Sequence, residues 1–174
     1  MKELMSLGVA IVIFIAWNQQ STRYTQQSAE IETFKQVLED YEDREWEDMV
    51  AHYSDTAKIM NNVTEKDAKN LTQFLAENKK DASQFSSWDF VNDASEYEMI
   101  VNDRGETWVN FWGLWEGTFK TNNKVYKIPT HITAQFVNGK IVREFGYWDV
   151  SKIIRDIQQD RIDELSSSEE RTGN

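Results

Sequence analysis

The 174-residue sequence contains no cysteine. This absence excludes disulfide bonds, thiolate metal sites and a cysteine nucleophile, and it leaves the redox compartment open. Only two histidines are present, His52 and His131, and neither has clustered acidic partners. We therefore expect no metal ion. The sequence also lacks a Gly-rich phosphate loop, a nucleophile elbow and a zinc signature, so we expect no cofactor.

Basic residues are scarce. The chain has 19 Lys and Arg residues against 30 Asp and Glu residues, which gives a net charge of −11. Nucleic-acid binding needs a clustered basic face, so we expect no nucleic-acid partner, and the acidity favours solubility. The 40% hydrophobic and 13% aromatic content is typical of one globular domain with a sizeable core.

The N-terminal segment 1–17 carries an apolar run from Leu4 to Trp17. This run is short for a membrane span and typical of the apolar region of an export signal. The letters "FIAW" followed by "NQQS" resemble a bacterial lipoprotein signal, with Trp17 at the position of the lipidated cysteine, so lipidation is impossible there. We expect an export signal or an uncleaved anchor, which places the protein in the periplasm or on the membrane through this segment only. An ordinary buried helix is the alternative.

The rest of the chain divides into three parts. Residues 18–29 are polar and form a predicted tether, and residues 165–174 form a polar tail that we expect to be disordered. The folded domain covers residues 30–164. Its first half has helical spacing at 31–41 and 46–53, and a further helix is predicted from a capping signature at Thr64.

The second half is typical of β-structure, and a last helix follows it. Asn138-Gly139 is the strongest hairpin signal. Helices followed by an antiparallel meander predict an α+β fold. The predicted strands are 85–92, 95–101, 106–119, 124–137 and 140–149, and the last helix is 150–164.

Two stretches carry a resemblance to a known family: "DYEDREWEDMVAHYSDTAKIM" and "HITAQFVNGKIVREFGYWDVSKI". In their order and aromatic content they resemble the nuclear transport factor 2-like superfamily, which includes SnoaL-like and ketosteroid isomerase-like proteins. The resemblance covers about residues 30–157. It implies a cone-shaped, cystatin-like fold, in which a curved antiparallel sheet wraps around the N-terminal helices and often leaves a pocket. Members include isomerases, cyclases, hydrolases, dehydratases and non-catalytic binding domains.

Strand register predicts which aromatic side chains face the helices. We take Asn138-Gly139 and Asn122-Asn123 as two-residue loops, so that opposed residues share a face. A bulge at Gly113 or Gly117 would invert the faces beyond it. The predicted inner face includes Phe111, Trp115, Thr130, Arg143, Phe145 and Tyr147. The predicted outer face includes Trp108, Trp112, Leu114, His131, Glu144 and Trp148.

The outer tryptophans predict a contact surface, because large exposed apolar patches mark interaction sites. In the resembled superfamily this sheet face commonly pairs two subunits. We therefore expect a homodimer through Trp108, Trp112, Leu114, His131 and Trp148. Alternatively, polar neighbours such as Gln135 and Glu144 cover these rings within a monomer.

The inner face predicts a site for a small apolar ligand. The predicted ligand-binding residues are Tyr53, Asn61, Trp115, Thr130, Arg143, Tyr147 and Asp149. An inward Arg143 needs either a helix carboxylate (Glu39, Asp40 or Asp55) or a pocket holding water or an anion, because an isolated buried charge is costly. Asp149 either lines the pocket or caps the last helix.

Two positions do not match the ketosteroid isomerase pattern, and these mismatches argue against that activity. The resemblance puts Asn61 at the position of the carboxylate base and Val37 at that of the tyrosine donor, and neither performs that chemistry. We therefore expect a non-catalytic binding or accessory domain. The alternative is a SnoaL-like isomerase, cyclase or hydrolase acting on an apolar or polycyclic substrate, with Arg143, Tyr147 and Asp149 as anchoring and acid–base groups.

Overall fold

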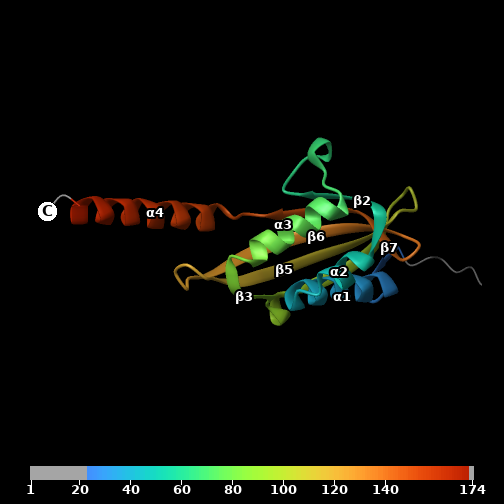
Figure 1. The fold of residues 1–174 in the computed structure, drawn as a ribbon. Coiled ribbons are helices and arrows are strands. Elements are labelled where there is room, and N and C mark those ends of the chain that lie inside the picture. The colour runs from blue at the N-terminus through green and yellow to red at the C-terminus, as the bar shows by residue number, and fades with distance from the viewer. Residues whose placement is uncertain (1–22, 173–174) are drawn as a thin grey trace, which may run out of the picture.

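A computed structural model describes residues 23–172 of the chain. It has an α+β architecture, as predicted, with helices at the N-terminal side and a strongly curved sheet (Figure 1). The elements are β1 (Tyr24–Thr25), α1 (Ala29–Asp43), α2 (Trp46–Ala51), β2 (Tyr53–Asn61), η1 (Glu65–Asp67), α3 (Leu71–Ala82), β3 (Phe85–Phe90), η2 (Asn92–Ala94), β4 (Glu96–Val101), β5 (Thr107–Phe119), β6 (Val125–Val137), β7 (Lys140–Trp148) and α4 (Ser151–Thr172).

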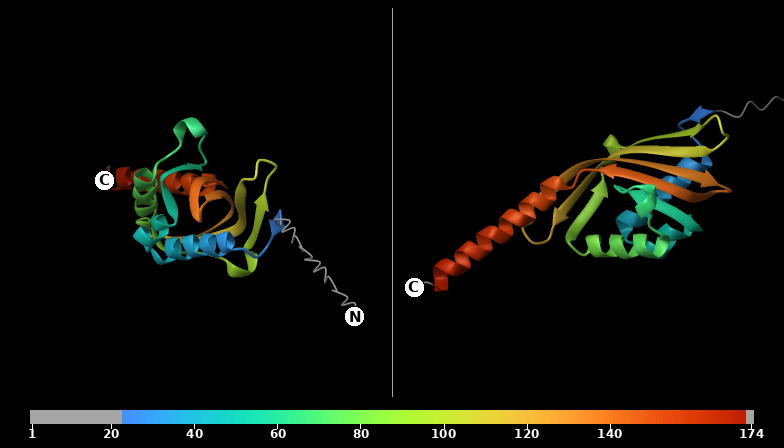
Figure 2. Two further views of the ribbon diagram at one scale, coloured as in Figure 1. Left: turned by 90° about the vertical axis from the view of Figure 1, so that its right-hand side faces the viewer. Right: turned by 90° about the horizontal axis from the view of Figure 1, so that it is seen from above.

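The seven strands form one sheet in the order β1-β4-β5-β6-β7-β2, and β3 pairs with the far end of β5. All neighbours are antiparallel except β2, which runs parallel to β7. Helices α1, α2 and α3 lie together on one face of this sheet, as the two views in Figure 2 show. We call that face the inner face. The opposite side, the outer face, carries Trp108, Trp112, His131 and Tyr147 on β5, β6 and β7.

Local signals set the helix ends. Ser28 is the N-cap of α1, and its hydroxyl accepts a hydrogen bond from the backbone N–H of Ile31 at 3.2 Å. Asn70 and Gln73 form a reciprocal capping box at the start of α3. The prediction that Thr64 opens this helix was therefore wrong, because Thr64 precedes only the short turn η1.

The core lies between the inner face and the helices. Its completely buried members come from both layers, namely Ile31, Phe34, Met49, Ile59, Val109, Phe111 and Ile141. Burial of such side chains contributes roughly 1.5–3 kcal/mol each. Phe111 contacts the rings of Phe34 and Phe90 at centroid distances of 6.2 and 5.0 Å, so the aromatic strand β5 supplies much of this core.

The β6–β7 hairpin has the predicted turn and an unpredicted bulge. Asn138 and Gly139 both have positive φ, and Val137 pairs with Lys140. The register then shifts, because Phe136 pairs with Ile141 and Gln135 with Arg143, which leaves Val142 as an extra residue. Side chains alternate along a strand, so every residue of β7 beyond Val142 faces opposite to the prediction.

The β5–β6 connection is longer than predicted, but this difference does not change the face on which each side chain lies. Thr118 pairs with Val125, and Trp115 pairs with Ile128 rather than Thr130. This difference is a shift of two residues, which leaves each side chain on its predicted face.

The two ends of the described chain carry more structure than the sequence predicted. Tyr24 and Thr25, within the predicted tether, form β1 and pair with β4. Helix α4 continues beyond residue 164 to Thr172 and projects away from the domain (Figure 1). It contains no glycine or proline, so nothing breaks the helix where its packed residues end. Within residues 23–172 no helix is long and apolar enough to cross a membrane. The predicted export segment 1–17 lies outside the described residues.

Candidate functional site

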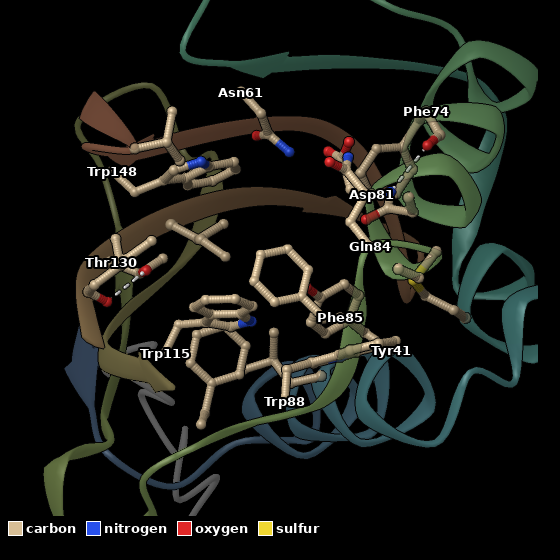
Figure 3. Close-up of a pocket in the computed structure, with 18 of the residues that line it drawn as sticks. Tyr41, Asn61, Phe74, Asp81, Gln84, Phe85, Trp88, Trp115, Thr130 and Trp148 are labelled. Carbon is tan, nitrogen blue, oxygen red and sulfur yellow. Dashed lines mark hydrogen bonds between the residues drawn. The ribbon is translucent and has the colours of Figure 1, made fainter. Parts of the chain in front are cut away.

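A cavity of about 350 Å³ lies between the inner face and the helices (Figure 3). Its walls are mainly aromatic and aliphatic. The rings of Tyr41, Phe85, Trp88, Trp115 and Trp148 face its interior, with Asn61 at one side. Asp81 near the end of α3 and Gln84 in the connection to β3 lie at another side. This volume and lining are typical of a small-molecule site.

A buried carboxyl group lies in the cavity wall. Glu144 on β7 is only 3% exposed. The Tyr53 hydroxyl donates a hydrogen bond to its Oε2, and the Asn61 side-chain amide donates one to its Oε1 at 2.9 Å. Both donors come from β2, the parallel neighbour of β7. The three residues form a fixed group, which we call the Glu144 triad.

Burial controls the ionisation of this triad. It raises the pKa of Glu144, although the hydrogen bonds from Tyr53 and Asn61 act in the opposite direction. Burial and the neighbouring Glu144 charge raise the pKa of Tyr53 well above its usual value of 10.0. The triad places a carboxyl group with a raised pKa beside a hydroxyl group, and both groups can give or accept a proton.

Several polar side chains belong to the cavity wall. The indole N–H of Trp88 and the side-chain oxygen of Asn61 are buried without a hydrogen bond within the described chain, whereas Trp115 interacts with the Tyr41 hydroxyl and lowers its pKa. Burial also raises the pKa of Tyr41 to about 12, so its hydroxyl stays protonated. These side chains place a few polar groups in an otherwise apolar wall, as in small-molecule sites.

The structure brings together four of the seven predicted ligand-binding residues. Tyr53, Asn61, Trp115 and Thr130 all line the cavity. The hydroxyl of Thr130 donates a hydrogen bond to the backbone carbonyl of Ile128 at 3.2 Å, so this bond lies within strand β6 itself.

Arg143 and Tyr147 lie on the outer face, and their predicted inward orientation was wrong because of the bulge at Val142. The Arg143 guanidinium lies 5.9 Å from the Trp108 ring and 5.2 Å from the Phe145 ring. Phe145 was likewise predicted to face inward. Among the described residues Arg143 makes no ion pair, and Asp40, one of the three carboxylates considered as its partner, instead contacts the His52 ring nitrogen at 3.2 Å.

Asp149 does not line the cavity. It is exposed just before α4, and its carboxylate accepts the backbone N–H of Ser151 at 2.8 Å. Hydrogen bonding with Ser151 lowers the pKa of Asp149. Its role at the start of the helix is therefore the capping alternative that the sequence left open.

The predicted outer patch is altered by the same bulge. Trp108, Trp112, Leu114 and His131 lie on the outer face, but Trp148 lines the cavity, which corrects its predicted position. Tyr147 takes its place outside. The Trp112 and His131 rings stack at 4.9 Å, and the His131 and Tyr147 rings at 6.2 Å.

Sequence reasoning missed Glu144 and Trp148 as cavity residues. Both follow Val142, and a two-residue turn at Asn138-Gly139 gives no sign of a bulge further along the hairpin. One signal was available: an inward Arg143 required a buried carboxylate partner that no nearby strand residue supplied. The next residue, Glu144, satisfies its inward position with two neutral donors.

Comparison with solved structures identifies the fold. No family model matches the sequence, and no curated protein matches it. A candidate polyketide cyclase from Xanthomonas campestris has a TM-score of 0.61 at 14% identity, with 75% of this chain and 98% of that chain covered. A nuclear transport factor 2-like protein of unknown function from Burkholderia pseudomallei has a TM-score of 0.59 at 14% identity, covering 74% and 97%.

A third solved structure has a ligand. It is a protein with a ketosteroid isomerase-like fold from Catenulispora acidiphila in complex with trimethylamine, with a TM-score of 0.56 at 8% identity over 69% of this chain and 87% of that chain. Identities this low establish the fold alone. The chain therefore has the nuclear transport factor 2-like, SnoaL-like fold, and the predicted resemblance is confirmed at that level.

Proposed function

We propose that the protein binds a small, mainly apolar molecule in the cavity between the inner face and the helices. The observation that carries this proposal is the 350 Å³ cavity itself, which is walled by aromatic rings and by the buried carboxyl group of Glu144. A purely structural core would fill such a space with side chains. The complex of a protein of the same fold with trimethylamine is consistent with the binding of a small ligand by this fold.

The test is binding of N-phenyl-1-naphthylamine, an apolar dye whose fluorescence rises in an apolar site. Ala82, at the end of α3, lines the cavity, whereas Ala76 on the same helix is exposed and outside it. We expect the dye to bind the wild type and Ala76→Trp, and Ala82→Trp to abolish binding while remaining folded by circular dichroism. Absence of dye binding to the wild type, or equal binding to both variants, would contradict the proposal.

A second candidate is an acid–base enzyme, and the Glu144 triad is the observation that favours it. Arg143, Tyr147 and Asp149, the groups first expected to do this chemistry, lie outside the cavity. Glu144 instead supplies the carboxyl group, with Tyr53 as a neighbouring hydroxyl. Exchange of the α-protons of 2-indanone in D2O, followed by NMR, tests this candidate. Catalysis by the wild type and its loss in Glu144→Gln would support an enzyme, whereas equal rates would refute one.

We also propose a homodimer through the outer face. Trp112 and Tyr147 are 42% and 54% exposed there, and they belong to one stacked row with His131. Exposed aromatic rings of this kind are typical of interface cores. Arg143 and Trp108 lie beside the row and extend the patch.

We also propose, from the sequence, that the protein is exported. The apolar run of residues 1–17 supports a signal or anchor that carries the domain to the periplasm or holds it at the membrane. Cell fractionation with mass determination of the mature chain tests this proposal. A full-length chain in the cytoplasm would contradict it.

A further inference from the structure

The charge of the cavity wall is one-sided. Two carboxyl groups line it, the buried Glu144 from β7 and the solvent-exposed Asp81 from the end of α3. Among the described residues that line it there is no Lys, Arg or His. In its ionised form Glu144 gives the cavity a negative charge, and an anionic ligand would meet no compensating positive charge among the described residues that line it.

The buried carboxyl of the Glu144 triad lacks a cationic partner. Its two hydrogen-bond donors, Tyr53 and Asn61, are neutral. The nearest arginine in the sequence, Arg143, lies on the opposite face of the same strand against the Trp108 ring. Buried carboxylates are normally paired with a cation, so the triad provides half of an ion pair.

The other walls also suit a cation. Aromatic rings present negative faces to a cavity, and they attract positively charged nitrogen within about 6 Å. Tyr41, Trp88, Trp115 and Trp148 face the interior (Figure 3). Asn61, whose amide donates to Glu144, also lines the cavity and adds a polar side chain beside the carboxyl group.

We infer that the ligand is an organic cation, an amine or ammonium compound with an apolar body, whose nitrogen lies beside Glu144 and Asn61. This inference rests on the proposed function, since it assigns the chemical class of the molecule that the cavity holds. The aromatic walls receive the apolar body.

Three probes of similar shape test the inference: 2-phenylethylamine, 2-phenylethanol and phenylacetate carry positive, zero and negative charge at neutral pH. Each competes with N-phenyl-1-naphthylamine for the wild type, and the dissociation constants are compared. We expect the amine to bind at least about tenfold more tightly than the alcohol, and phenylacetate to bind most weakly. Glu144→Gln should reduce the preference for the amine to less than about threefold. Glu96→Gln, which removes an exposed carboxylate of β4, should leave it unchanged.

The outcomes separate the inference from the function on which it rests. If the dye binds and the alcohol or phenylacetate equals or exceeds the amine, the cationic class is wrong while the cavity remains a binding site. If the dye fails to bind the wild type, the proposed function itself is wrong. The wild-type comparison needs no variant, so it decides the matter even if Glu144→Gln does not fold. Where that variant folds, an undiminished amine preference would also overturn the assignment to Glu144.

Discussion

Arg143 and Glu144 are consecutive residues of β7 whose side chains lie on opposite faces of the sheet. Arg143 lies over the rings of Trp108 and Phe145 on the outer face, and Glu144 accepts hydrogen bonds from Tyr53 and Asn61 inside. The extra residue Val142 decides which of the two faces inward. Without it the cavity would contain a guanidinium and favour an anion. With it the cavity contains a carboxyl group.

Replacement of Glu144 by Gln should change how stability depends on pH. Burial raises the pKa of Glu144 above 4.5 in the folded state, so folding favours the protonated form. The wild type therefore loses stability as the pH rises from about 4.5 through the folded-state pKa, and it keeps this contribution in full below that range. Glu144→Gln cannot ionise, so its melting temperature should rise relative to the wild type as the pH increases. The same temperature difference at every pH would contradict a buried, ionisable Glu144.

Tyr53→Phe should destabilise the protein, because it leaves Oε2 of Glu144 without its donor. We expect a loss of about 1–3 kcal/mol in the free energy of unfolding, which should grow as the pH rises and Glu144 ionises. In the background of Glu144→Gln the same substitution should cost less. Urea unfolding of the two single variants and the double variant measures this coupling. Tyr147→Phe, on the exposed outer face, is the matched control and should have little effect. Additive losses in the double variant would refute the contact.

The sequence was sufficient to predict most of the fold. Alternating hydrophobic residues located β5 and β6, helical spacing located α1 and α2, and Asn138-Gly139 located the hairpin between β6 and β7. Their long, regular periods leave little ambiguity. The inward position of Trp115 also followed, because a register shift of two residues preserves the face.

The orientation of β7 could not be predicted in the same way. A bulge depends on how the two strands pack against the helices, and one extra residue reverses all side chains that follow. Gly113 and Gly117 were the positions at which the sequence left a bulge open, but the regular β5–β6 register continues through both. The bulge is at Val142, a residue typical of regular strands. For this reason Arg143 and Glu144 exchanged their predicted faces.

Gly113 and Gly117 in β5 should respond differently to alanine. A Cβ at Gly113 would lie 2.2 Å from Cζ of Phe111, and a Cβ at Gly117 would lie 2.2 Å from Cη2 of Trp115. Phe111 is completely buried in the core and cannot move, whereas Trp115 borders the cavity and has space beside it. We expect Gly113→Ala to lower the free energy of unfolding by about 1–3 kcal/mol and Gly117→Ala to cost less. Gly117→Ala should nevertheless weaken dye binding, because the indole moves into the cavity. Chemical denaturation and dye titration measure the two effects, and an equal loss of stability would contradict the account.

The proposed dimer predicts that a charge at Trp112 separates the subunits. Trp112 is exposed and stacks on His131, so in a dimer its ring would be buried at the centre of the outer face. A buried, unpaired carboxylate in an interface is strongly unfavourable, and Trp112→Glu should therefore convert the dimer to a monomer with little change in the fold. Light scattering should give twice the 20.4 kDa chain mass for the wild type and the single mass for the variant. Val125→Glu, which alters an exposed apolar residue at the start of β6, is the control and should remain dimeric. A monomeric wild type, or a Trp112→Glu variant that stays dimeric, would exclude the outer face as the interface.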